Sequence, residues 1–239
     1  MIETSPILSW LIFLPTLGAL FVLLLPASRV ALIRQTALAF TVGTFVLSLV
    51  AAGMFNWTAG GEYGKNVQLA TNVMWMSSLN VHYYVGVDGL SLPLVLLTTA
   101  ISLLACLASF SIEKNVKGYF ALFLFLVTGM LGVFTSLDLM LFYVFFEVSL
   151  FPMYFLIGIW GGPRKEYAAI KFFLYTLLGS VGILIVILGI YHFTSLDGRP
   201  PCFDLIKLAS PEINGMFTTG PALQFAGLAF WLLFIGFAV

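Results

Sequence analysis

Hydrophobic residues gather along this chain into long blocks that are separated by short polar segments. A helix needs about 20 apolar residues to cross a hydrocarbon core roughly 30 Å thick, and about seven blocks come close to that length or exceed it. They cover residues 7–25, 31–55, 89–112, 119–135, 139–160, 167–193 and 222–239. The pattern predicts an all-α fold, a polytopic bundle of transmembrane helices with about seven spans.

Two polar stretches, residues 56–87 and 194–221, interrupt the blocks and are expected to lie outside the bilayer. The first of them alternates apolar and polar residues at Val67-Gln68-Leu69 and again over residues 81–85. A period of two is typical of strands. We therefore expect short strands or a hairpin at this place.

The last hydrophobic block is still apolar at Val239, without a polar flank or a basic anchor. A finished span usually ends in such a flank. We therefore interpret residues 1–239 as a single membrane domain that is cut within its seventh span.

Composition agrees with insertion into a bilayer. Hydrophobic residues make up 61% of the chain and charged residues 8%, whereas a soluble domain carries about 25% charged residues. The formal net charge is zero, so nothing indicates a nucleic acid or another polyanionic partner.

Basic residues predict the orientation of the spans. Short loops rich in lysine and arginine stay on the cytoplasmic side of a membrane. Such residues follow the first, third and fifth blocks, at Arg29, Arg34, Lys114, Lys117, Arg164 and Lys165. These three loops are therefore expected on the cytoplasmic side, and the N-terminus on the periplasmic side.

Glu147 is the candidate for chemistry, because it lies well inside the block over residues 139–160. A carboxylate at the centre of a spanning helix costs roughly 2.5–3.5 kcal/mol, and its side chain is too short to reach water. It must be protonated, paired or beside a water-filled path, which suits a proton relay. The alternative is a neutral Glu147 that locks the bundle through a hydrogen bond to a neighbouring helix.

Three further residues are candidates for a proton path. Pro152 frees the carbonyl of Val148, which could hold water near the carboxylate, although a packing kink explains it equally well. Lys171 lies near the cytoplasmic end of the sixth block, at a depth that differs from that of Glu147 by roughly 13 Å. A direct salt bridge is therefore not expected, and Lys171 either snorkels toward the headgroups or reaches Glu147 through water.

Asp138 opens the fifth block, where a helix N-cap or the helix dipole accounts for it. A role in proton exit is the alternative. No Cys/His cluster, phosphate loop or nucleophile–base arrangement is recognisable in the sequence. We therefore expect no metal, haem, flavin or iron–sulfur cluster on this chain.

The residues around Glu147 resemble a known family. The segments 146–153, 156–161 and 171–180, together with Gly86-Val87-Asp88-Gly89-Leu90-Ser91-Leu92, are similar to subunit M (chain 4) of NADH-quinone oxidoreductase, respiratory complex I. This resemblance implies the N-terminal half of a proton-pumping, antiporter-like membrane subunit. Such subunits have about fourteen spans, arranged as inverted repeats.

The resemblance also implies roles and partners. In that family the glutamate that matches Glu147 pairs with a lysine on the seventh helix, just after the segment that matches Gly236-Phe237-Ala238-Val239, and takes part in proton translocation. NADH, FMN, iron–sulfur clusters and quinone are used by other subunits. The expected partners are the other membrane-arm subunits, and the expected location is the bacterial inner membrane, with the mitochondrial inner membrane as the alternative.

Two other functions stay open at this point. A cation/proton antiporter subunit outside the NADH enzyme would share the fold and the buried acid. A scaffold bundle without transport of its own would need Glu147 for packing alone.

Overall fold

A computed structural model describes residues 5–58, 66–195, 201–218 and 220–238 of the chain. Within these ranges, seven helices are long and apolar enough to cross a membrane. They are α1 (Ile7–Leu24), α2 (Val30–Met54), α3 (Ser91–Ala108), α4 (Val116–Thr135), α5 (Leu139–Trp160), α6 (Lys165–Ser195) and α9 (Gly220–Ala238). The seven predicted spans are confirmed to within a few residues, and the chain is a multi-pass membrane protein. Val239 lies outside the described residues.

The first polar stretch contains the hairpin that its alternation predicts. Strands β1 (Gln68–Met76) and β2 (Val81–Val87) pair antiparallel, joined by the short helix η1 (Ser77–Leu79) and by Asn80 in the left-handed conformation, with φ 53°. An asparagine tolerates that conformation better than most residues. Residues 59–65 of this stretch lie outside the described part of the chain.

The second polar stretch forms three short helices. They are α7 (Leu205–Leu208), α8 (Pro211–Asn214) and η3 (Gly215–Thr218), and a further short helix, η2 (Ser109–Ser111), follows α3. Residues 196–200 lie outside the described part.

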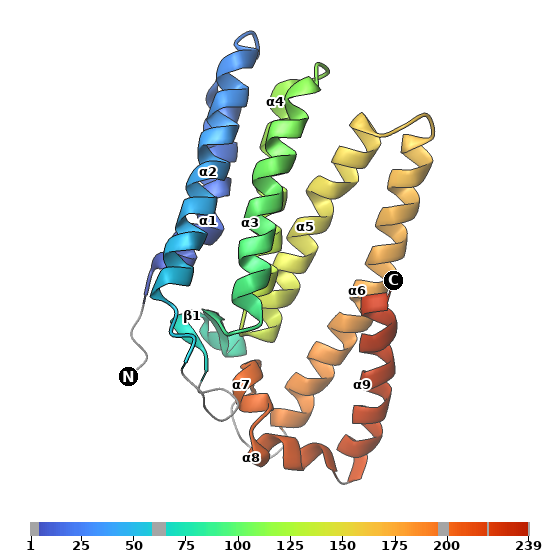
Figure 1. Cartoon of the computed structure of the whole chain (residues 1–239). Coiled ribbons are helices and arrows are strands. Elements are labelled where there is room, and N and C mark those ends of the chain that lie inside the picture. Colours follow the sequence, from blue (N-terminus) through green and yellow to red (C-terminus); the bar gives the residue numbers. More distant parts are fainter. Residues whose placement is uncertain (1–4, 59–65, 196–200, 219, 239) are drawn as a thin grey trace.

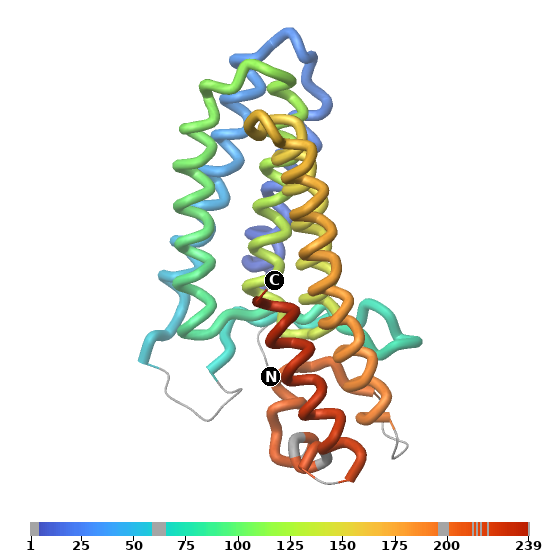
Figure 2. Tube along the Cα trace, turned by 90° about the vertical axis from the view of Figure 1, so that its right-hand side faces the viewer, coloured from blue at the N-terminus to red at the C-terminus, as the bar shows by residue number. Residues whose placement is uncertain are grey.

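The helices alternate in direction, so that the loops sort into two ends (Figure 1). The basic loops after α1, α3 and α5 lie together at one end, and Figure 2 shows the same arrangement from the side. The hairpin, α7 and α8 lie at the other end. We call these the basic-loop end and the hairpin end.

The core lies mainly between α1 and α4, where apolar side chains such as Leu11, Ile12, Leu124 and Leu131 are fully or almost fully buried. Buried hydroxyls also link the helices, since Thr16 bonds Thr128 at 2.7 Å and Ser48 bonds Thr99 at 2.8 Å. Without water as a competitor, such bonds help to hold membrane helices together.

Close packing between α4 and α5 fixes the helix that carries Glu147. A Cβ atom at Gly132 would collide with the ring of Phe145, and one at Gly129 would lie 2.8 Å from Cβ of Ser149. The absence of a side chain at these two positions therefore lets the backbones approach, as is common in membrane bundles.

Candidate functional site

Glu147 lies eight residues after the start of α5, which is about 12 Å along the helix axis. Its Oε1 atom is buried and has no hydrogen-bond partner among the described residues. An isolated charged oxygen in such surroundings is costly. The position is therefore suited to a carboxyl group that holds a proton, or that receives a partner which the described residues do not supply.

Two polar side chains, Tyr143 of α5 and Ser180 of α6, lie in this part of the bundle. Tyr143, one turn earlier on α5 than Glu147, packs against a buried cluster that includes Ile183 and Ile187 of α6. Ser180 is fully buried, and its Oγ donates a hydrogen bond to the carbonyl of Leu177 at 3.0 Å. Neither residue could be singled out from the sequence, because a tyrosine and a serine within apolar blocks carry no signal that distinguishes them from packing residues.

The last turn of α9 reaches α5 near the same level. The rings of Phe142 and Phe237 are in edge contact, with centroids 6.0 Å apart. A Cβ atom at Gly236 would lie 2.8 Å from the carbonyl oxygen of Gly179 on α6, next to Ser180. Helices α5, α6 and α9 therefore meet around Tyr143 and Ser180.

Pro152 is buried within α5, five residues after Glu147. It cannot donate a hydrogen bond to the carbonyl of Val148. In the same turn, the hydroxyl of Ser149 donates to the carbonyl of Phe146 at 2.7 Å. A role of the Val148 carbonyl in holding water stays a prediction.

Lys171 lies apart from Glu147. It is exposed near the start of α6, and its Nζ lies 6.0 Å from the ring centre of Tyr167, a cation–π distance. It lines a cavity of about 890 Å³ at the basic-loop end, together with Arg164 and Lys165. Among the described residues no ion pair joins Lys171 to Glu147.

Asp138 is the N-cap of α5, as predicted. Its Oδ1 accepts hydrogen bonds from the amides of Met140 at 3.0 Å and Leu141 at 3.1 Å. Its Oδ2 accepts one from the amide of His82 in β2, also at 3.0 Å. Burial raises the pKa of the Asp138 carboxyl, and the three amide donors oppose that shift only in part.

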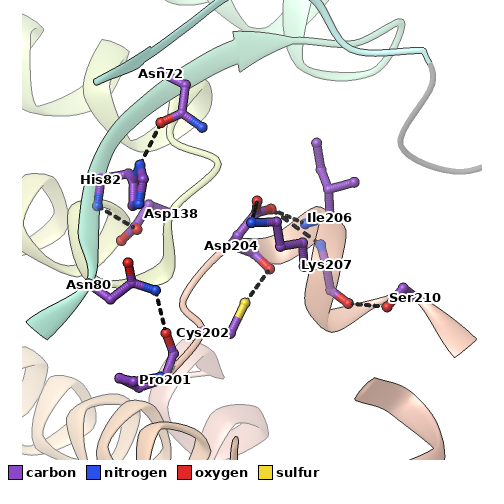
Figure 3. A network of polar contacts seen from close by, with 10 residues as sticks. All are labelled: Asn72, Asn80, His82, Asp138, Pro201, Cys202, Asp204, Ile206, Lys207 and Ser210. Atoms are coloured by element: carbon purple, nitrogen blue, oxygen red, sulfur yellow. Dashed lines mark hydrogen bonds and ion pairs between the residues drawn. The ribbon is translucent and has the colours of Figure 1, made fainter. Parts of the chain in front are cut away.

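The surroundings of Asp138 join three segments at the hairpin end (Figure 3). The ring of His82 bonds the side chain of Asn72 at 2.7 Å, and Asn80 donates to the carbonyl of Pro201 at 2.7 Å. Asp204 is the N-cap of α7, and its backbone pairs with that of Asp138 in an isolated antiparallel β-bridge. We call this group of residues the hairpin junction.

A small cavity lies within the hairpin junction. It has a volume of about 20 Å³ and is lined by residues that include Asp138, His82 and Asp204. That is room for one water molecule in polar surroundings. Within the described part of the chain, no group of three or more His, Cys, Asp or Glu side chains is arranged to hold a metal ion.

Comparison with known families agrees with this architecture. The profile described as "NADH:quinone oxidoreductase/Mrp antiporter, TM" matches residues 136–239. The profile "NADH-ubiquinone oxidoreductase chain 4, amino terminus" matches residues 63–137. The chain belongs to the family of membrane subunits that these two profiles describe.

Relatives in the family come from bacteria and from organelles. The chain is 34% identical to the NADH-quinone oxidoreductase subunit M of Rickettsia bellii, over 98% of this chain and 45% of the relative. It is 38% identical to the chloroplastic NAD(P)H-quinone oxidoreductase chain 4 of Mesostigma viride, over 87% of this chain and 39% of the relative. The chain thus spans less than half the length of these relatives.

Solved structures share the fold. A chain of respiratory complex I from Thermus thermophilus with bound NADH aligns with a TM-score of 0.74 and 27% identity, over 95% of this chain and 43% of that chain. A chain of the Mrp complex from Dietzia sp. aligns with a TM-score of 0.72 and 19% identity, over 96% and 23% respectively. The second likeness concerns the fold alone.

Proposed function

We propose that this chain forms the N-terminal half of a proton-translocating, antiporter-like membrane subunit of an NADH:quinone oxidoreductase, with Glu147 as a site that takes up and releases protons. The observation that carries the proposal is the Oε1 atom of Glu147, which is buried in mid-span without a partner among the described residues. An ionised carboxylate there is costly unless a proton neutralises it or a cation pairs with it.

The partner that the family resemblance implies is a lysine on the seventh helix. Helices α5 and α9 run in the same direction (Figure 1), and Phe237 contacts Phe142. Glu147 lies five residues beyond Phe142 on α5. The position on the seventh helix that is level with Glu147 is therefore about five residues, or 7.5 Å, beyond Phe237. A lysine placed there could approach Oε1 and pair with the carboxylate of Glu147.

The other three candidates, Lys171, Pro152 and Asp138, would lie along the path of protons to and from Glu147. Lys171 lies at the basic-loop end, where it would attract or relay protons at the entrance. Pro152 would leave a carbonyl free for water one residue from Glu147. Asp138, beside the single-water cavity of the hairpin junction, would serve proton exit.

Redox chemistry would take place on other subunits of the enzyme. NADH, FMN, the iron–sulfur clusters and quinone would be used by other subunits, and this chain would contribute to the enzyme as a translocating subunit. Its partners would be other membrane-arm subunits. Its location would be the bacterial inner membrane, with the N-terminus on the periplasmic side.

The test is Glu147→Gln in the full-length protein within its assembled complex. We expect proton translocation per electron to fall strongly, because the amide cannot bind and release a proton. Glu147→Asp should retain part of the activity, since it keeps the acid with a shorter reach. Glu166→Gln, the same change at an exposed residue in the first turn of α6, is the matched control and should pump normally.

Normal assembly with undiminished pumping in Glu147→Gln would exclude an obligatory role and favour the scaffold alternative. The antiporter alternative is supported by the family description, which names Mrp antiporters. Co-purification of flavin and iron–sulfur subunits would favour the NADH enzyme. Sodium exchange without those subunits would favour the antiporter.

A further inference from the structure

We infer that a groove beside the loop from α5 to α6 binds a phospholipid with an anionic headgroup. The lipid phosphate contacts Lys171 and Arg164, and an acyl chain follows α6 toward the middle of the bilayer. The groove lies at the basic-loop end, where α5 ends at Trp160 and α6 begins at Lys165. The inference goes beyond the proposed function, because it depends neither on Glu147 nor on proton transfer.

The groove consists of two adjoining cavities along α6. The larger one, of about 890 Å³, extends from the loop residues 161–164 to Tyr175. The smaller one, of about 400 Å³, shares Tyr167, Lys171 and Tyr175 with it and continues to Leu178. From Lys165 to Leu178 the groove follows the helix for about 20 Å. One leaflet contributes roughly 15 Å of hydrocarbon, so the groove is long enough for a headgroup contact and for an acyl chain below it.

The walls of the groove are apolar beyond the loop. Ile157 and Phe172 line the larger cavity, and Ile170, Leu174 and Leu178 line the smaller one. Leu174 and Leu178 are 59% and 72% exposed on the face of α6. Exposed leucines within a membrane span are suited to contact with acyl chains, which are as apolar as the side chains themselves.

The mouth of the groove carries cations without acidic partners. Arg164, Lys165 and Lys171 line it, whereas Glu166, the nearest acid along the chain, does not. The Nζ of Lys165 donates a hydrogen bond to the carbonyl of Ile159 at 2.8 Å. Arg164 and Lys171 have no side-chain hydrogen bond or ion pair within the described ranges. Their charges are therefore available to an anionic ligand.

Lys171 distinguishes this groove from an ordinary lipid-facing surface. It lies six residues after the start of α6, about 9 Å along the axis, where a cation surrounded only by acyl chains would be costly. Its Nζ lies 6.0 Å from the ring centre of Tyr167, one turn nearer to the loop, so the side chain points back toward the basic-loop end. There its three N–H donors suit a lipid phosphate, and basic pockets between membrane helices recognise anionic headgroups.

Two alternatives make different predictions. If the cations have no effect on lipid choice, a zwitterionic phospholipid occupies the groove as readily as an anionic one. If a neighbouring subunit covers the apolar walls, no phospholipid reaches them.

The experiment uses the full-length protein in its assembled complex, reconstituted into phosphatidylcholine vesicles. The vesicles contain a small fraction of a phospholipid with a photoactivatable diazirine in its acyl chain, either phosphatidylglycerol or phosphatidylcholine. After illumination and peptic digestion, mass spectrometry measures the lipid adducts on residues 172–178 of α6. Adducts at Ile101 are the reference, because this exposed side chain of α3 lies at a similar distance from the basic-loop end.

Wild-type protein should prefer the anionic lipid in the groove. Phosphatidylglycerol should label residues 172–178 about fivefold more than phosphatidylcholine does, since one basic residue near an anionic headgroup contributes about that factor. Both lipids should label Ile101 equally. Arg164→Gln and Lys171→Gln should each lower the preference, and the double variant should abolish it. In about 1 M salt the wild-type preference should fall as well, because the Debye length shortens to about 3 Å.

Lys114→Gln is the matched control for charge. It removes a cation from the same end of the molecule, but Lys114 lies in the loop after α3 and does not line the groove, so the preference should equal that of the wild type. Ala168→Trp tests the shape of the groove. Ala168 is exposed and lines the larger cavity, so an indole ring there should reduce labelling by both lipids without a change of charge.

Equal labelling of the wild-type groove by the two lipids would overturn the inference. An absence of adducts on residues 172–178, with normal labelling of Ile101, would also overturn it and would show that protein covers the groove. A preference that persists in the double variant would refute the role of these two cations. If the variants do not assemble, a wild-type preference that is unchanged in high salt would overturn the inference. Normal pumping by Glu147→Gln would instead refute the proposed function and leave the lipid result intact.

Discussion

Asp138 and Glu147 lie at the start and in the middle of α5, and their oxygens have opposite surroundings. The oxygens of Asp138 accept three backbone hydrogen bonds. The Oε1 of Glu147 accepts none from the described residues. Asp138 is therefore held in one place, whereas Glu147 has an oxygen left for an incoming proton or cation.

Burial of Asp138 has a consequence for stability against pH. Because its pKa is raised in the folded protein, the folded state binds this proton more tightly than the unfolded chain does. Its contribution to the free energy of unfolding is therefore largest at acidic pH and decreases as pH rises above about 4, the ordinary value. An asparagine side chain does not titrate, so the thermal stability of the wild type relative to Asp138→Asn should decrease between acidic and neutral pH.

Thermal unfolding of the purified protein in detergent at several pH values measures this difference. His192→Gln, which removes a titratable residue in the last turn of α6, controls for general effects of pH. A difference between wild type and Asp138→Asn that is constant across pH would contradict the assignment.

At the scale of elements, the contact between α4 and α5 depends on Gly132. A Cβ atom there would collide with the ring of Phe145, which is two residues before Glu147. Gly132→Ala should therefore push the helices apart and destabilise the protein by about 1–3 kcal/mol. We also expect lower pumping, because α5 carries Glu147.

Gly53→Ala is the matched control for that substitution. A Cβ atom at Gly53 in α2 would meet nothing within 4 Å, and alanine favours a helix over glycine by about 1 kcal/mol at most. Its melting temperature should be unchanged or slightly higher. Equal melting temperatures for Gly132→Ala and the wild type would show that the contact is not as tight as described.

The elements could be predicted from the sequence, but the contacts between them could not. Long apolar blocks and a period of two are local signals, so the spans and the hairpin were predicted correctly. The backbone β-bridge between Asp138 and Asp204 joins residues that are far apart along the chain, and so does the hydrogen bond from the His82 amide to the Asp138 carboxylate. No periodicity in the sequence predicts such contacts.

The same limit applies to the candidate site. Glu147 could be singled out because a carboxylate inside an apolar block is rare and costly. Tyr143 and Ser180 could not, since both residue types are common in membrane helices and only the packing of α5 against α6 brings the ring of Tyr143 to the buried side chains of Ile183 and Ile187. A sequence therefore shows where a charge lies in an apolar span, but not which residues of other helices pack around it.

At the scale of the whole molecule, the separation of the two ends predicts an orientation. Basic loops favour the cytoplasmic side, and here they share one end (Figure 1). In intact cells, an impermeant thiol reagent should label Ser78→Cys in the hairpin but not Lys114→Cys in the loop after α3. Both positions are exposed, and both native cysteines are buried.

Permeabilised cells are the control, because both substituted residues should then react. Labelling of Lys114→Cys in intact cells, without labelling of Ser78→Cys, would reverse the orientation and with it the direction of entry and exit assigned to Lys171 and Asp138.

Helix α6 has 31 residues and therefore measures about 46 Å, well over the roughly 30 Å of a hydrocarbon core. From Lys165 to Ile187, which packs against Val81 of the hairpin, the distance along the axis is about 33 Å. If α6 starts at one edge of the hydrocarbon core and stands upright, the hairpin lies at the opposite edge and the last two turns of α6 extend beyond it. In that position water would reach the polar residues at the hairpin end without any opening through the acyl chains.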